Sequence, residues 1–159
     1  PVIPNVRVDI EGRSYLLKFI EIATLSKKEL EKVNSMILLF AIVEPSSFVN
    51  IRAKWLPHIK AVQETLSRQD IMPYIMLVGT KEDLKFQHYS TLIDSNEMIM
   101  CSQSVNNAVP FVQCSSWTGE NIPNVFLPAA RLALPNAILK AQIAYDESQK
   151  CCNKYCTIL

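Results

Sequence analysis

Hydrophobic and polar residues alternate along this chain with two periods, and the shorter one predicts strands. Apolar side chains at Val6, Val8 and Ile10 alternate with polar ones, as on a half-buried strand. A turn at residues 11–14, with Gly12 supplying an unusual backbone angle, leads into a second strand at residues 15–22. An unbroken apolar run predicts a strand buried on both faces at residues 36–43, a further buried strand is expected at residues 74–78, and another strand at residues 109–114.

The longer period predicts the helices. Ser26 is a candidate N-cap for a helix that reaches Val33, and residues 97–105 are weakly helical. Apolar residues recur at helical spacing across residues 48–68, and Pro57 is expected to kink or break that helix. The last helix spans about residues 121–144, with interruptions expected at Pro123, Pro128 and Pro135.

This alternation of strands and helices predicts an α/β fold, an open and mostly parallel sheet with helices on both faces. We expect one domain at residues 1–145 and a flexible tail at residues 146–159. The net charge of +1 predicts no nucleic-acid partner. The sequence holds three glycines and no G-x-x-x-x-G-K-[ST] segment, so it lacks the usual phosphate cradle.

The five cysteines fall into two groups. Cys101 and Cys114 lie in or beside apolar segments and are expected to be buried thiols. The other three crowd near the end of the sequence without zinc-ligand spacing, so no metal site is expected there. Cys156 and the following Thr-Ile-Leu fit a C-a-a-X signal for geranylgeranylation, with Cys151 and Cys152 as candidate palmitoylation sites. The expected location is the cytoplasmic face of a membrane.

Two polar segments follow predicted strands and are candidates for contacts with a base. Thr80, Lys81 and Asp83 follow a buried strand, where ligands bind in open α/β sheets. A carboxylate there can accept two hydrogen bonds from N1 and N2 of guanine, and the Lys81 stem can cover the base; a solvated charged loop is the alternative. Ser115 and Ser116 follow another strand, and their N–H groups can meet the base carbonyl; an ordinary turn is the alternative.

Three segments resemble Rho-family small GTPases, and the Rac subgroup above all: Pro45-Ser-Ser-Phe-Val-Asn-Ile-Arg-Ala-Lys-Trp-Leu-Pro57, Val78-Gly-Thr-Lys-Glu-Asp-Leu84 and Cys114-Ser-Ser-Trp-Thr118. The resemblance covers most of residues 3–134. It implies a G domain that binds GTP or GDP with Mg²⁺, hydrolyses GTP slowly, and binds Rho-family regulators and effectors. It also assigns guanine contacts to Thr80, Lys81, Asp83, Ser115 and Ser116.

The sequence departs from this family pattern where phosphate chemistry takes place. The resemblance places the first strand and the phosphate loop before residue 1. Asn5 stands where a magnesium-binding Thr is expected, and Glu21 replaces an Asp. Thr24 replaces the Gly that senses the γ-phosphate, and Leu25 replaces the Gln that positions water. The sequence therefore predicts no catalytic residue, and it makes nucleotide and Mg²⁺ binding doubtful.

The prediction is a Rac-like, membrane-anchored signalling protein with impaired nucleotide binding and hydrolysis. A fragment of an ordinary GTPase is one alternative, and a product that does not fold stably is another. A third is a non-enzymatic pseudo-GTPase module that binds Rho regulators or effectors. A phosphate-loop segment upstream of Pro1 would restore the ordinary GTPase interpretation.

Overall fold

The computed structural model describes residues 5–22, 24–66, 72–105 and 111–155, with side chains as far as residue 146. Within these ranges the strands form two separate sheets. An antiparallel hairpin pairs β1 with β2, and a parallel sheet has the order β3-β4-β5. The strands are β1 (Val6–Ile10), β2 (Arg13–Leu17), β3 (Ser35–Ala41), β4 (Tyr74–Thr80) and β5 (Val112–Gln113).

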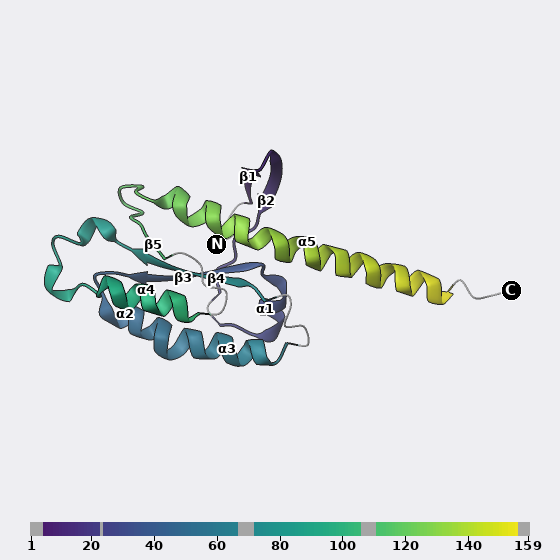
Figure 1. Ribbon diagram of the computed structural model, residues 1–159, viewed down its shortest axis with the longest axis horizontal. Helices are drawn as coiled ribbons and strands as arrows, with labels where there is room; N and C mark the ends of the chain where they lie inside the picture. Colours follow the sequence, from purple (N-terminus) through teal and green to yellow (C-terminus); the bar gives the residue numbers. More distant parts are fainter. Residues whose placement is uncertain (1–4, 23, 67–71, 106–110, 156–159) are drawn as a thin grey trace.

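Helices cover both faces of the parallel sheet, which confirms the predicted fold class. Figure 1 shows α5 on one face and α2, α3 and α4 on the other. The helical elements are α1 (Lys27–Lys32), α2 (Pro45–Asn50), the π-helical turn η1 (Ile51–Trp55), α3 (Leu56–Glu64), the 3-10 turns η3 (Glu82–Leu84) and η4 (Tyr89–Thr91), α4 (Ser95–Ser104) and α5 (Ile122–Tyr155).

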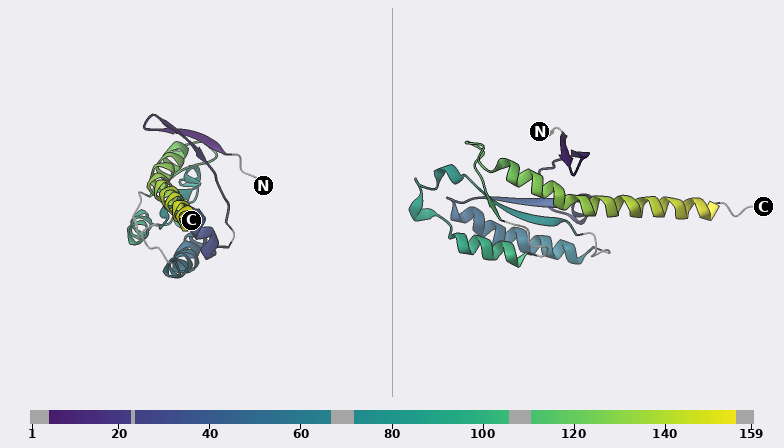
Figure 2. Two further views of the ribbon diagram at one scale, coloured as in Figure 1. Left: turned by 90° about the vertical axis from the view of Figure 1, so that its right-hand side faces the viewer. Right: turned by 45° about the horizontal axis from the view of Figure 1, so that its top comes forward.

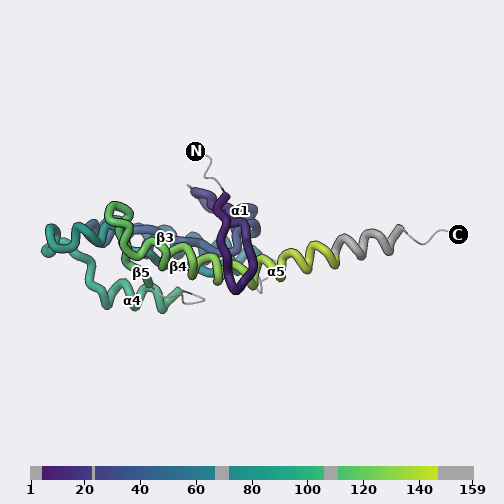
Figure 3. Tube along the Cα trace, turned by 90° about the horizontal axis from the view of Figure 1, so that it is seen from above, coloured from purple at the N-terminus to yellow at the C-terminus, as the bar shows by residue number. Residues whose placement is uncertain are grey.

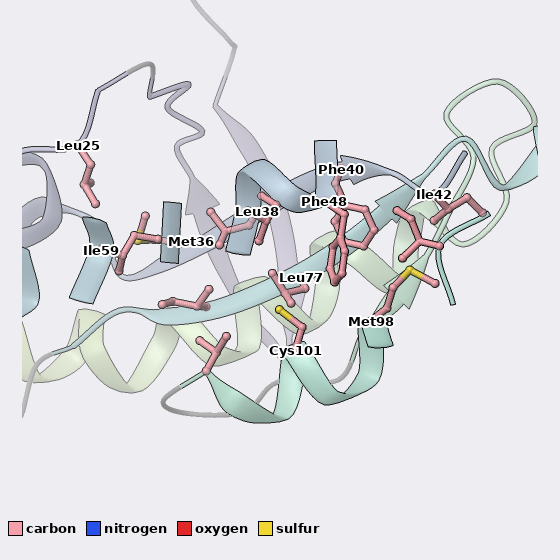
Figure 4. Close-up of a cluster of buried hydrophobic side chains, with 14 of the residues drawn as sticks. Leu25, Met36, Leu38, Phe40, Ile42, Phe48, Ile59, Leu77, Met98 and Cys101 are labelled. Atoms are coloured by element: carbon pink, nitrogen blue, oxygen red, sulfur yellow. The ribbon is translucent and has the colours of Figure 1, made fainter. Parts of the chain in front are cut away.

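Side-chain burial explains these layers. Met36, Leu38 and Phe40 of β3 alternate toward α2–α4, where they form the main core with Phe48 and Ile59 (Figure 4). A second core lies between the sheet and α5, and it contains Met76, Val78, Val125 and Ala129. Both faces of β4 are therefore buried, as its apolar sequence predicts.

Strand β3 differs from β4 because one of its side chains is exposed. Leu39, expected inside a fully buried strand, is 61% exposed. Among the described residues, β3 pairs only with β4 and β2 pairs only with β1, so each strand has an unpaired edge. The family resemblance places a further strand in this position. Without one in the described part of the chain, the two sheets remain separate.

The prolines distort the helices less than the sequence predicts. The π-helical turn η1 immediately precedes Pro57, and Leu56 N–H donates to Ile51 O. This wider turn lets one helical segment continue from α2 into α3. Helix α5 likewise runs through Pro128 and Pro135 without the expected interruption.

Tertiary contacts hold α5 on both sides of its prolines. Val125 and Ala129 are buried against the sheet. Farther along, Asn136 Nδ2 donates to Asn34 O at 3.2 Å and to Met72 O at 2.6 Å. Such contacts offset the backbone hydrogen bonds that proline removes. By length and composition alone Ile122–Asp146 could cross a membrane; 22% of this window is buried, and Val125 and Ala129 pack on the sheet.

The predicted flexible tail is also corrected in part. Helix α5 continues to Tyr155 instead of ending near Ala144, so residues 146–155 are helical. No proline or glycine lies between Asn136 and Tyr155 to end the helix. In Figure 1 this part of α5 runs past the end of the parallel sheet. The proposed lipidation residue Cys156 lies outside the described residues.

Candidate functional site

Strands β4 and β5 bring the two candidate loops to the same edge of the sheet. They are parallel neighbours, and Gly79 is paired with Gln113. Beyond the strands, Cys114 N–H donates to Gly79 O at 2.8 Å and Glu82 N–H donates to Cys114 O at 3.2 Å. The two loops are therefore hydrogen-bonded to each other through the backbone.

Gly79 permits this close packing. A Cβ atom at this position would lie 2.5 Å from Ile42 Cγ2 and 3.1 Å from Phe111 Cζ. The first distance is shorter than any ordinary carbon contact, so a larger residue would displace its neighbours. Gly79 is thus required at the point where β4 enters the loop.

The centre of the site is a hydrogen bond between two residues that the sequence places in different loops. Ser115 Oγ donates to Asp83 Oδ1 at 2.5 Å, and Thr118 N–H donates to Ser115 Oγ at 3.1 Å. Ser115 is fully buried, and its N–H donates to Glu120 O. Asp83 is therefore held in one orientation, while its second carboxylate oxygen accepts no hydrogen bond within the described residues.

Residues before Asp83 fix the path of its loop. Thr80 Oγ1 donates to Phe40 O at 3.0 Å, which ties the end of β4 to β3. Lys81 follows with φ at +65°, a left-handed conformation that turns the chain sharply into η3. Its side chain is exposed, and its predicted cover of a base stays a prediction.

The structure shows a buried carboxylate oxygen at Glu82, unpaired within the described part of the chain and beside Asp83 in the same loop. Glu82 Oε2 is buried and has no hydrogen-bond partner among the described residues. A buried carboxylate oxygen without a donor is destabilising, so this atom is a potential acceptor for a ligand donor. The sequence pattern did not reveal this buried oxygen, because Glu82 has the character of a solvated loop residue.

Ser116 is exposed in the turn after Ser115, and its predicted base contact stays a prediction.

The two buried thiols lie where the sequence predicts them. Cys114 is 4% exposed at the end of β5, and Cys101 is 7% exposed within α4. Burial raises the pKa of both thiols, and the nearby carboxylate of Glu82 adds to the effect at Cys114. Both thiols are therefore poor nucleophiles at neutral pH.

Leu25, the residue in the position of the water-orienting Gln, lies far from the two candidate loops that hold Asp83 and Ser115, called the base-contact loops below for their predicted role. It is 5% exposed and belongs to the main core. Its carbonyl oxygen accepts a hydrogen bond from His58 Nε2 at 2.8 Å, so His58 is tied to this segment and is more than a solvated helix residue. In Figure 4 Leu25 is drawn at the end of the cluster opposite Ile42.

Helix α1, directly after Leu25, confirms this placement. Lys27 Nζ donates to Thr65 O at 3.0 Å, at the C-terminal end of α3. That end leads toward the start of β4, whereas Thr80 and the loops lie at the other end of the strand. A strand of this length spans about 20 Å. Leu25 and the candidate base site are therefore at different ends of the domain.

The described residues fit the base of a nucleotide better than its phosphates. Asp83 and Ser115 supply an oriented acceptor for guanine donors. Within residues 5–22, 24–66, 72–105 and 111–146, no three His, Cys, Asp or Glu side chains come together to hold a metal ion. The oriented acceptor at Asp83 thus matches the base-binding half of a nucleotide site.

Comparisons with known proteins agree with this geometry. The model of the Ras family matches residues 19–134. The Rho-related protein racN of Dictyostelium discoideum is 26% identical over 130 residues, which cover 75% of this chain and 55% of that protein. The chain thus spans about half the length of this curated relative. Because the family match covers the sheet, both loops and most of the helices, the chain belongs to the Ras family of small GTPases, with a likeness to its Rho-related members.

Proposed function

We propose that this chain is a Rac-like guanine-nucleotide-binding protein whose base site is retained and whose hydrolysis is impaired. The observation that carries the first part is the Asp83–Ser115 hydrogen bond, which orients a carboxylate between two loops. Guanine offers donors at N1 and N2, and a carboxylate oxygen has lone pairs for more than one of them. Adenine offers no such pair of donors, so this arrangement selects guanine.

The proposal that hydrolysis is impaired rests on residues that the structure describes. Leu25 has no group that can orient water by hydrogen bonding, and its side chain is packed in the core. Thr24 and Glu21 also replace residues that serve phosphate and magnesium in the family pattern. We expect GTP turnover at the background rate and weaker nucleotide binding than in ordinary members of the family.

Calorimetric titration of the purified chain with GDP and with ADP, in Mg²⁺, tests base selection. GDP is expected to bind more tightly than ADP. The Asp83→Ala substitution is expected to weaken GDP binding by about 1–3 kcal/mol, roughly 5- to 150-fold in Kd. Glu120→Ala is the matched control, because it removes a nearby exposed carboxylate that has no side-chain hydrogen bond in the described structure. Equal affinity for GDP and ADP would contradict base selection, and phosphate release above background would contradict impaired hydrolysis.

A non-enzymatic interaction module is the second candidate, and exposed aromatic residues favour it. Phe86, Tyr89 and Trp117 are 92%, 82% and 88% exposed. They follow β4 and β5, on loops that leave the same edge of the sheet. Aromatic residues are enriched at protein interfaces. Such a module would bind Rho-family regulators or effectors without nucleotide, and Trp117→Ser would weaken that binding while leaving GDP titration unchanged.

Membrane anchoring through Cys156 is a further part of the proposal. Where Leu159 is the carboxyl terminus, the last four residues fit a geranylgeranylation signal, and Cys151 or Cys152 can carry the second lipid needed for stable anchoring. The expected location is the cytoplasmic face of a membrane. Fractionation of cells that express Cys156→Ser tests this: the variant should be soluble, and unchanged membrane partition would contradict the anchor.

A further inference from the structure

A pocket lies between the hairpin and α5, away from the base-contact loops. Figures 2 and 3 show the hairpin crossing over α5. The pocket has a volume of about 640 Å³, within the range of small-molecule sites. The lining residues that matter below are Ile10, Arg13 and Tyr15 from the hairpin and Arg131, Leu134 and Ile138 from α5.

Two backbone features shape this pocket. Glu11 and Gly12 have φ values of +52° and +76°, which closes a two-residue turn and pairs Ile10 with Arg13. On the opposite wall, Pro135 has no N–H to donate to the carbonyl of Arg131, four residues earlier in α5. The turn of α5 at the pocket therefore lacks one backbone hydrogen bond, and both residues face the hollow.

The polar side of the pocket is cationic. Arg13 and Arg131 come from different elements and line the same hollow, and neither forms an ion pair or side-chain hydrogen bond with the described residues. Glu11 is the one acidic residue of the lining, so the two arginines leave an excess of positive charge. Guanidinium groups match carboxylate and phosphate oxygens through paired N–H donors.

The other side of the pocket is apolar. Ile10 is 2% exposed at its base, while Ile138, one turn after Leu134 on α5, is 61% exposed. A small inorganic anion would leave this apolar surface in water. A ligand that carries an anionic group on a hydrocarbon or aromatic group would cover it and meet both arginines.

We propose that the pocket between the hairpin and α5 binds an anionic amphiphile, a phosphate or carboxylate joined to an apolar group. Arg13 and Arg131 bind the anionic oxygens, and Ile10, Leu134 and Ile138 contact the apolar group. The site is independent of guanine binding, because its residues lie on the hairpin and α5 and none belongs to the base-contact loops.

Titration of the purified chain with phenyl phosphate, followed by amide NMR shifts, tests the site. We expect saturable shifts at residues of the hairpin turn and of α5 near Pro135. Arg13→Gln and Arg131→Gln should each weaken binding about fivefold. Arg7→Gln is the matched control, an exposed arginine of the same hairpin outside the pocket, and should leave binding unchanged. Ile138→Ser should weaken phenyl phosphate binding, whereas Leu139→Ser, one residue away, should not.

Further titrations identify the source of the anionic group and separate specific binding from non-specific electrostatic attraction. Inorganic phosphate should bind at least fivefold more weakly than phenyl phosphate; equal binding would overturn the amphiphile. Hexanoate binding that depends on both arginines supports a carboxylate ligand. Arginine-dependent binding to phosphatidylserine vesicles supports a lipid source. The proposed site would be overturned if Arg7→Gln lost as much affinity for phenyl phosphate as Arg13→Gln does. It would also be overturned if none of these probes gave a saturable NMR shift.

Discussion

Replacing Leu25 by glutamine puts back the residue type that the family uses to orient water, and the structure predicts that the change destabilises the fold and leaves catalysis unchanged. The side chain is 5% exposed in the main core. Losing a buried leucine costs about 1.5–3 kcal/mol, and burying an amide without partners adds about 1–3 kcal/mol. We therefore expect Leu25→Gln to lower the free energy of unfolding by about 2.5–6 kcal/mol.

Urea denaturation followed by circular dichroism measures this loss, and thermal unfolding should show Tm lower by about 5–24 °C. Leu16→Gln is the control, because Leu16 is 65% exposed and its substitution should change stability by no more than about 0.5 kcal/mol. Leu25→Met, which keeps the volume and the apolar character, should cost less than about 1.5 kcal/mol and retain a folded protein.

Turnover separates the two interpretations of Leu25. Because Leu25 lies in the core at the end of the domain away from the Asp83 loop, a glutamine there has no route to a nucleotide held by that loop. GTP hydrolysis by Leu25→Gln should stay at background. Unchanged unfolding together with a gain of phosphate release would refute the placement of Leu25 in the core and the proposal of impaired hydrolysis.

Three further predictions follow from other parts of the fold. Gly79→Ala should cost about 1–3 kcal/mol in urea unfolding, because its Cβ would meet Ile42 Cγ2; unchanged stability would contradict the close packing. Alkylation followed by mass spectrometry should label Cys101 slowly until the protein unfolds, since burial raises its pKa. NMR titration should find the pKa of Glu29 below its ordinary value because Ser26 donates to it. The unfolded state then binds the proton more tightly, so this contribution to stability is present above the unfolded pKa and is lost as pH falls through the folded one.

Local sequence patterns determined the elements and the candidate base site. Alternation and Gly12 predicted the hairpin, and the turn forms at that position. Ser26 predicted the start of α1, which begins at Lys27. The base-contact loops could be predicted together because parallel strands deliver their carboxyl ends to one edge of a sheet. These features depend on neighbours in sequence or on a general rule of sheet topology.

The tertiary structure decided the features that depend on what packs from a distance. Leu39 belongs to an apolar run that predicts burial, yet it is exposed because no described element covers it on the face of β3 opposite Leu38 and Phe40. Pro135 lies in a sequence that predicts a break, yet α5 continues because Asn136 binds carbonyl groups from two other segments. Leu25 and the pocket that Arg13 shares with Arg131 could not be predicted at all. A sequence pattern records which residues tolerate burial, whereas the free energy of packing against partners far along the chain decides which of them are buried and what they meet.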